Sequence, residues 1–197
     1  MPATRWILIA AATLAPAIGS AQQFTGPKPH GALSTPVALD TTGKFLAAIS
    51  RVGDVYVGGQ PTEAGLREMR EQGVTTVVNL RTPEEMKRIG FDEAALAKQL
   101  GMKYVYLPVR GNAEYPYSPE TVTRFAEALR QSDGKVLLHC TVGWRASHLW
   151  AAYLIKNRGI AQDSALANAR AINLMDEHRG PDGKLPIEEF LGRSIKG

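Results

Sequence analysis

The chain's only cysteine, Cys140, stands where an apolar run ends. The stretch KVLLHCTVGWRAS, residues 135–147, continues with Gly143 and Arg145, and a helical pattern then begins. Gly143 gives the backbone the freedom to curl between strand and helix. The N–H groups of such a turn, together with the helix N-terminus, attract an anion. Arg145 adds a planar, permanently charged guanidinium that suits an oxyanion, so the segment predicts an anion site beside a thiol.

The same neighbours favour the reactive form of the thiol. A cysteine among N–H donors, close to a guanidinium and a helix N-terminus, loses its proton readily. The thiolate is the attacking species, so one loop would both bind the anion and activate the nucleophile. Burial as a small hydrophobic residue is the common fate of a free cysteine, but it requires none of these neighbours. We therefore expect Cys140 to be a nucleophile.

Strand and helix patterns alternate along the rest of the chain. Strands are expected at residues 54–59, 74–80, 102–109 and 135–139, and helices at 61–73, 92–101, 118–134, 145–159, 163–178 and 186–194. This rhythm predicts an α/β fold with a central, mostly parallel sheet flanked by helices. Ligands of such sheets bind outside the carboxyl ends of the strands, which is where Cys140 falls.

The N-terminal region divides into two segments ahead of the expected catalytic domain. Residues 1–21 combine Arg5, an apolar run and small residues up to Ala21, as a secretory signal peptide does. A retained membrane anchor is the alternative, but the apolar run is shorter than the roughly 20 residues that span a bilayer. We expect residues 22–50 to form an arm or linker and residues 51–197 the catalytic domain. The mature protein would be periplasmic or secreted, with no stable membrane insertion.

Composition excludes several kinds of partner. The formal net charge is +4, without a clustered stripe of Lys and Arg, so no nucleic-acid partner is expected. A single cysteine allows no internal disulfide. His30 and His178 are far from Cys140 in the sequence and give no ligand spacing with it. We expect neither a metal nor another cofactor.

The segment VLLHCTVGWRAS resembles the active-site loop of cysteine-dependent phosphatases of the tyrosine and dual-specificity superfamily. VYVGGQPTEAGLREMREQGVTTVVNLRTPEE and LGMKYVYLPV are similar to its compact bacterial and fungal members, so the resemblance covers roughly residues 51–160. The pattern is nearest to small bacterial proteins described as sulfurtransferases or as beta-lactamase-hydrolase-like. The resemblance implies hydrolysis of a phosphate monoester, phosphotyrosine included, through a phosphocysteine intermediate. The partner would be a small phosphorylated substrate or a phosphoprotein.

The resemblance also implies roles for single residues. Cys140 would be the nucleophile and Arg145 the phosphate clamp, while His139 would help to set the thiolate. The phosphate oxygens would be cradled by the amides of the loop, from Thr141 through Val142, Gly143 and Trp144 to Arg145.

Two departures from the phosphatase pattern leave other functions open. Four residues separate Cys140 from Arg145, where the common phosphatase loop has five. Loops of this shorter size are also a rhodanese feature. Ala146 follows the arginine where the usual phosphatase has a hydroxyl residue, and Ser147 comes one place later. A rhodanese-like sulfurtransferase with a persulfide on Cys140, or a non-catalytic anion-binding module, are therefore the alternatives.

The proton donor for the leaving oxygen is not obvious from the sequence. The family carries an aspartate after the strand that corresponds to residues 102–109, but the loop RGNAEYPYSPE contains none. Glu114 is its only carboxylate before the helix cap, so it is the candidate acid, with a solvated loop residue as the alternative.

Two further residues are candidates for substrate binding, each with a structural alternative. Arg81 follows the strand at 74–80 and would contact the substrate, unless it pairs with Glu84 or Glu85. Trp144 would form an apolar rim at the site, unless it packs under the loop.

Overall fold

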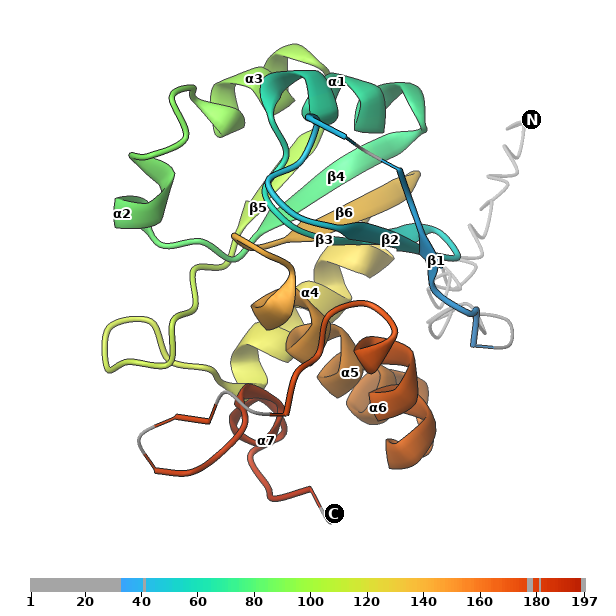
Figure 1. Ribbon diagram of the computed structural model, residues 1–197, viewed down its shortest axis with the longest axis vertical. Coiled ribbons are helices and arrows are strands. Elements are labelled where there is room, and N and C mark those ends of the chain that lie inside the picture. Colours follow the sequence, from blue (N-terminus) through green and yellow to red (C-terminus); the bar gives the residue numbers. More distant parts are fainter. Residues whose placement is uncertain (1–32, 41, 177–178, 181, 196–197) are drawn as a thin grey trace, which may run out of the picture.

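The computed structural model describes residues 33–40, 42–176, 179–180 and 182–195, in which one sheet lies between two layers of helices (Figure 1). The strands lie in the order β1 (Val37–Ala38), β2 (Ile49–Val52), β3 (Val55–Gly58), β6 (Lys135–His139), β4 (Val74–Asn79) and β5 (Lys103–Tyr106). β3, β6, β4 and β5 are parallel, whereas β1 and β2 are antiparallel strands at one edge. The predicted fold class, a mostly parallel sheet flanked by helices, is confirmed.

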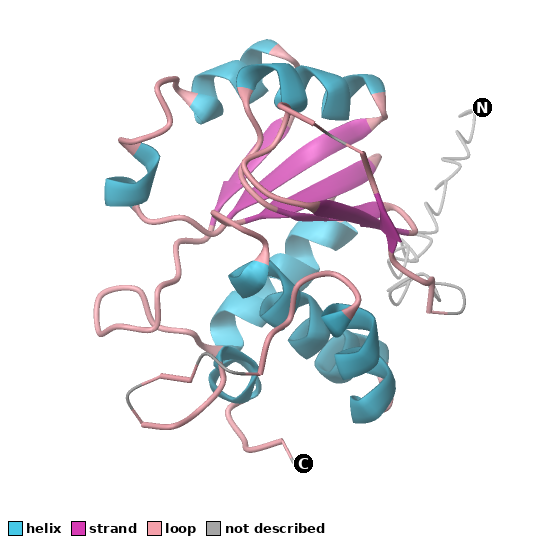
Figure 2. Ribbon diagram, in the orientation of Figure 1, coloured by secondary structure: helices cyan, strands magenta, loops and turns pink. Residues whose placement is uncertain are grey.

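The helices divide between the two faces of the sheet (Figure 2). α1 (Glu63–Glu71) and α3 (Glu93–Gln99) cover one face. The other face is covered by α4 (Pro119–Arg130), α5 (Trp144–Arg158), α6 (Gln162–Arg170) and α7 (Pro186–Leu191). The short α2 (Pro83–Met86) lies beside the carboxyl end of β4. Among the described residues, no helix combines the length and apolar character needed to cross a bilayer.

Alternating side chains of the strands build a separate core on each face. Val77 of β4 and Leu137 of β6 pack with the residues of α1 and α3, whereas Val78 and Leu138 pack with those of α4 to α7. This alternation is the period of a strand buried on both sides, and it explains the nearly continuous apolar runs in the sequence.

α5, the helix that follows the cysteine loop, is the buried centre of its layer. Every residue from Arg145 to Leu154 is buried, which is typical of a helix surrounded by other elements. The helix ends at Gly159, whose φ of 63° provides the left-handed turn of a helix C-terminus. Arg145 therefore lies at the start of the part of α5 that other elements surround.

The N-terminal region differs from the predicted division. The predicted boundary at residue 51 falls inside β2, which pairs with β3 over its whole length. Phe45 is only 8% exposed and belongs to the core beneath α1. Residues 33–40 and 42–50 therefore pack onto the body of the domain instead of forming a separate arm. The predicted signal peptide, residues 1–21, lies outside the described residues.

Candidate active site

Cys140 follows β6, the strand that lies between β3 and β4. The Cys140 amide donates a hydrogen bond to the Gly58 carbonyl (3.2 Å), and the Leu80 amide donates to the His139 carbonyl (3.0 Å). Backbone hydrogen bonds to the ends of both neighbouring strands thus hold the end of β6. The loop begins at the carboxyl edge of the sheet, as the sequence predicted.

Gly143 makes the turn from the loop into α5. Its φ is +87°, a left-handed conformation, and a Cβ atom there would lie 3.1 Å from the carbonyl carbon of Gly58. Glycine is required both for the backbone angle and for this close approach. The Gly143 amide donates to the sulfur of Cys140 at 3.2 Å.

Side chains on both sides of the turn hold its carbonyl groups. The Ser147 hydroxyl donates to the Gly143 carbonyl (2.7 Å), so it serves the start of the helix rather than the Cys140 sulfur. The Asn173 amide donates to the Val142 carbonyl (2.6 Å). These bonds tie the loop to α5 and to the segment that follows α6.

Cys140 itself is 1% exposed. Burial alone would also suit a cysteine with a packing role. The feature that a packing role does not require is the backbone N–H of Gly143, which points at the sulfur of Cys140.

Arg145 is buried beside the loop and held by a carboxylate. Its Nη1 and Nη2 atoms donate to the two oxygens of Glu85, at 3.0 and 2.6 Å. Nη1 also donates to the carbonyls of Val109 (2.6 Å) and Leu80 (3.2 Å), and Nη2 to the Thr141 hydroxyl (3.2 Å). Burial lowers the pKa of Arg145, but its electrostatic interactions with Cys140 and Glu85 outweigh burial and make the net shift upward.

Glu85 is a residue of this site that the sequence analysis did not assign to it. Burial raises the pKa of its carboxyl. Hydrogen bonds from Arg145, the Thr82 amide and Thr141 have the opposite and larger effect, so the pKa falls to about 2. A carboxyl that is ionised at neutral pH cannot act as the proton donor. Thr82 and Glu85 form a capping box at the start of α2, and this T-x-x-E pattern was the available signal.

Arg81 lies at the same edge of the sheet and is 4% exposed. Its Nη1 donates to Gln60 (2.6 Å), and its Nη2 donates to the backbone carbonyl of Glu85 (2.8 Å), not to a carboxylate. Nε is buried without a hydrogen-bond partner among the described residues. Burial lowers the pKa of Arg81. The structure therefore places Arg81 next to Arg145 and Glu85.

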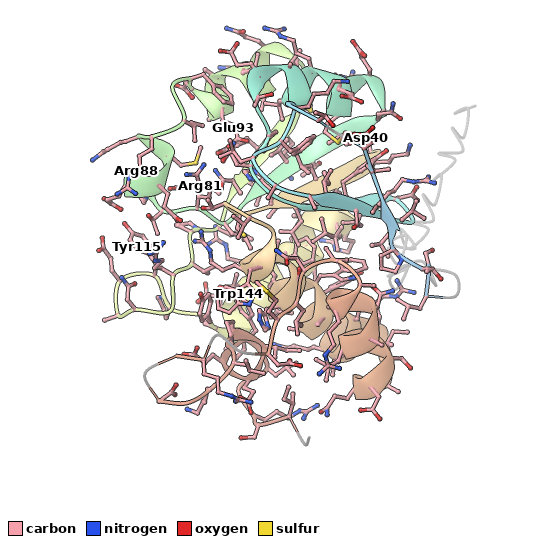
Figure 3. All side chains as sticks on the ribbon, in the orientation of Figure 1. Asp40, Arg81, Arg88, Glu93, Tyr115 and Trp144 are labelled. Atoms are coloured by element: carbon pink, nitrogen blue, oxygen red, sulfur yellow. The ribbon has the colours of Figure 1, made fainter. Side chains whose placement is uncertain are left out.

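Glu114 lies on the exposed loop between β5 and α4. A hydrogen bond to Glu114 raises the pKa of the Tyr115 phenol to about 12, and Figure 3 shows Tyr115 far out on this loop. Within the part of the chain that the structure describes, no contact joins Glu114 to Cys140 or Arg145. The structure thus does not bring the predicted acid to the loop, and its role stays a prediction.

Trp144 is the first residue of α5 and is partly exposed. Its Nε1 donates to the Met175 carbonyl (3.2 Å), and its ring meets the His148 ring edge-on, with centroids 4.9 Å apart. Burial lowers the pKa of His148 to about 4, so that ring is neutral at pH 7. Trp144 is thus anchored beside the loop while part of it still faces solvent.

His139 is fully buried, and its side chain lies on the sheet face opposite that of Cys140, as alternation along the strand requires. Its Nε2 lies 3.2 Å from Oε1 of Glu93. Two hollows of about 390 and 420 Å³ open elsewhere, and neither is lined by Cys140 or Arg145. In the described ranges, no three His, Cys, Asp or Glu side chains gather as a metal site would need.

Solved structures with the same architecture define the class of this fold. P. aeruginosa TpbA superposes with a TM-score of 0.53 at 20% identity, over 70% of this chain and 78% of that protein. A DUF442 protein from Shewanella putrefaciens CN-32 is 31% identical over 61% of this chain and 80% of its own, with a TM-score of 0.51. The fold is that of the cysteine phosphatases.

Sequence relatives point the same way. The beta-lactamase hydrolase-like protein of Xylella fastidiosa is 30% identical over 122 residues, which are 60% of this chain and 28% of that protein. Human dual specificity protein phosphatase 26 is 31% identical over 130 residues, 64% of this chain and 56% of that protein. The chain thus spans less than two thirds of these relatives.

Residues 36–180 match the family model described as DSP-PTPase phosphatase fused to NAD+ kinase, and the chain belongs to this family. The match confirms the predicted resemblance to the tyrosine and dual-specificity phosphatases.

Proposed function

We propose that this protein hydrolyses phosphate monoesters. The Cys140 thiolate attacks phosphorus, the bond to the leaving oxygen breaks, and water then hydrolyses the phosphocysteine to phosphate and thiolate. The observation that carries the proposal is the Gly143 amide donating to the Cys140 sulfur at 3.2 Å, beside the buried Arg145. Membership of the phosphatase family supports the same chemistry.

The remaining loop residues supply binding. Arg145 would clamp the phosphate, while the amides of Thr141, Val142, Gly143 and Trp144 surround its oxygens. Charge-assisted bonds of this kind stabilise the negative charge that builds up during transfer. Glu85 is ionised, so the proton for the leaving oxygen has to come from another group, and Glu114 remains the candidate.

The substrate would carry an aromatic or otherwise apolar group beside its phosphate, phosphotyrosine included. Val142 is 45% exposed within the loop, and Met175, whose carbonyl accepts from Trp144, is 39% exposed. These side chains give the site an apolar border. The fold relative TpbA has been solved in complex with pTyr, which is consistent with such a substrate.

Export is part of the proposal and is supported by the sequence of residues 1–21. Expression of the full chain with a C-terminal tag in a Gram-negative host checks it. N-terminal sequencing should place the mature terminus after Ala21, and an intact N-terminus in the cytoplasm would contradict export.

The activity is tested with a small aryl phosphate, using residues 22–197 under reducing conditions beside the Cys140→Ser variant. Hydrolysis that disappears in the variant is the expected result. Equal hydrolysis by both proteins would exclude Cys140 as the nucleophile.

A second candidate is favoured by the four-residue spacing between Cys140 and Arg145. A sulfurtransferase would carry a persulfide on Cys140 and transfer its sulfur from thiosulfate to cyanide. If the protein does not hydrolyse aryl phosphate but forms thiocyanate from thiosulfate and cyanide, it is a sulfurtransferase. If neither substrate reacts but phosphate still binds to both wild type and Cys140→Ser, the loop is an anion-binding module.

A further inference from the structure

Arg110 is a cation at the edge of the site that the proposed chemistry does not use. It begins the exposed loop between β5 and α4, and its side chain is 58% exposed. The Val109 amide just before it donates to the Leu80 carbonyl (3.0 Å). Its own amide donates to the Tyr115 carbonyl (2.7 Å) and closes the loop. The backbone of Arg110 is therefore held at the edge of the sheet, although its side chain faces solvent.

The guanidinium group of Arg110 reaches the carboxylate that holds Arg145. Oε1 of Glu85 accepts a hydrogen bond from Arg110 Nη1 (3.1 Å) and another from Arg145 Nη2 (2.6 Å). The hydroxyl of Thr141, the first residue of the loop after Cys140, donates to the same oxygen (3.0 Å). Because these three donors share one oxygen, Arg110 lies beside both the loop and the proposed phosphate clamp.

The two arginines that share this carboxylate differ in how firmly they are held. Arg145 is buried and also donates to the carbonyls of Leu80 and Val109. Within the part of the chain that the structure describes, the side chain of Arg110 makes no hydrogen bond other than the one to Glu85. An exposed ion pair contributes little to stability, so Arg110 can exchange Glu85 for an oxygen of a ligand while Arg145 stays in place.

Glu85 neutralises Arg110 only in part. Its single negative charge is divided between two guanidinium groups, and among the described residues no other acidic side chain lies at ion-pair distance from Arg110. Arg81 does not take up this carboxylate, because its Nη2 donates to the backbone carbonyl of Glu85 (2.8 Å). The exposed guanidinium group of Arg110 thus retains attraction for a further anion.

We propose that Arg110 determines specificity by binding a second oxyanion of the substrate, a carboxylate or another phosphate group, beside the phosphate held by the Cys140 loop. The inference rests on the proposed function of this loop as a phosphate site. An arginine presents several N–H donors in a planar fork that fits an oxyanion, and a single bond to Glu85 leaves the others for a ligand.

The second anion would lie on the α2 side of the site. Arg110 is bonded to Glu85, which belongs to α2, and Figure 3 shows Arg88 beside α2 and well apart from Trp144. The favoured substrate is therefore a phosphate monoester with an anionic group on the α2 side and an apolar group towards Trp144.

The test measures binding without turnover. Phenylphosphonate and its meta- and para-carboxy derivatives carry a C–P bond, which is not hydrolysed as a phosphate ester is. The measured quantity is the ligand concentration that half-protects Cys140, the chain's only thiol, from iodoacetamide at low ionic strength. In wild type, the better carboxy derivative should protect at an about fivefold lower concentration than phenylphosphonate, as expected for one exposed ion pair. In Arg110→Gln the two concentrations should become equal.

Arg88→Gln is the matched control, because it removes an exposed arginine from the same side of the site. It should keep the preference of wild type for the carboxy derivative. The inference is overturned if wild type shows no preference, or if Arg110→Gln keeps it. An equal loss in Arg88→Gln would also overturn it, because the preference would then reflect the general positive charge of this surface.

Phenylphosphonate, the ligand without a carboxylate, separates this inference from the proposed function. If it gives no protection, the loop is not a phosphate site, and the proposed function and the inference both fail. If it protects but the carboxylate brings no gain, only the role of Arg110 fails. Absence of aryl phosphate hydrolysis would contradict the proposed activity and leave this comparison of binding intact.

Discussion

Arg145 binds Glu85 with both terminal nitrogens of its planar guanidinium group. The two parallel bonds to Glu85 need a planar group with two donors, which a lysine ammonium cannot supply. We predict that Arg145→Lys weakens the binding of inorganic phosphate about tenfold to a hundredfold, as expected for a lost charge-assisted bond. The measurement is the phosphate concentration that half-protects Cys140 from iodoacetamide. Arg88→Lys, at an exposed site, is the control, and an unchanged value for Arg145→Lys would remove Arg145 from the anion site.

Glu85 connects stability to pH. The folded-state pKa of Glu85 is about 2, below the ordinary 4.5. The ionised carboxylate therefore adds its full share to the free energy of unfolding above about pH 4.5, and this share is lost as the pH falls towards 2. We predict that Glu85→Gln lowers the free energy of unfolding by about 3 kcal/mol at pH 7, because it leaves the buried Arg145 without a counter-ion. Urea denaturation should show this difference shrinking at pH 3. A difference that is equal at both pH values, or matched by the exposed Glu84→Gln, would contradict the assignment.

The site residues that the sequence predicted are close together along the chain, whereas those it missed interact with residues far away in the sequence. Cys140, Gly143 and Arg145 lie within six consecutive positions, so one loop argument covers all three. Glu85 meets Arg145 from 60 positions away, and Glu93 meets the end of β6 only after the sheet has assembled. Glu93 lies on a predicted helix and Glu85 follows a predicted strand, and a single glutamate in either place looks like a solvated residue until the fold brings its partners to it.

At the scale of the element, the turn into α5 depends on Gly143. An alanine at position 143 would have to adopt a positive φ, which costs about 1 kcal/mol or more. Its Cβ would also lie only 3.1 Å from the backbone of Gly58. Gly73 provides the matched control, because its φ of 89° is similar but its Cβ direction is open.

We predict that Gly143→Ala destabilises the protein by about 1 kcal/mol more than Gly73→Ala. It should also lower the affinity for phosphate, which Gly73→Ala should leave unchanged. Thermal denaturation and the alkylation-protection assay measure the two effects. Equal losses of stability together with unchanged protection would show that the turn tolerates a side chain.

Element length explains which parts of the fold the sequence revealed. The helices α1 and α4 have capping residues and an apolar period, and the expected segments contain them. α5 begins at Trp144, one residue before the expected segment 145–159, and stops at Gly159 as expected. β1, β2 and α2 have two, four and four residues, too few to show a period. β3 is equally short, but Gly58 and Gly59 mark its end in the sequence. The helix expected at 163–178 ends as α6 at Arg170, and the chain then turns towards the cysteine loop through Asn173.

At the scale of the whole molecule, the question is where the domain begins. The family match starts at residue 36, ahead of the predicted boundary at residue 51. Asn168 of α6 donates to the Ser34 carbonyl (2.8 Å) and accepts from Trp150 (2.9 Å), so the N-terminal segment is tied to the helices as well as to the sheet. Phe45 adds an apolar contact on the opposite face, beneath α1.

If residues 33–40 and 42–50 are an integral part of the domain, truncating Phe45 should destabilise the protein as much as truncating a core residue does. We predict that Phe45→Ala lowers the free energy of unfolding by about 3 kcal/mol, because it is 8% exposed and leaves a cavity between the segment and α1. Val37→Ala in the same segment should change it by less than about 0.5 kcal/mol, because Val37 is 51% exposed. Urea denaturation of both variants measures the difference. If Phe45→Ala lowers the free energy of unfolding as little as Val37→Ala does, the segment only lies on the surface. The domain would then begin at residue 51, as the sequence predicted.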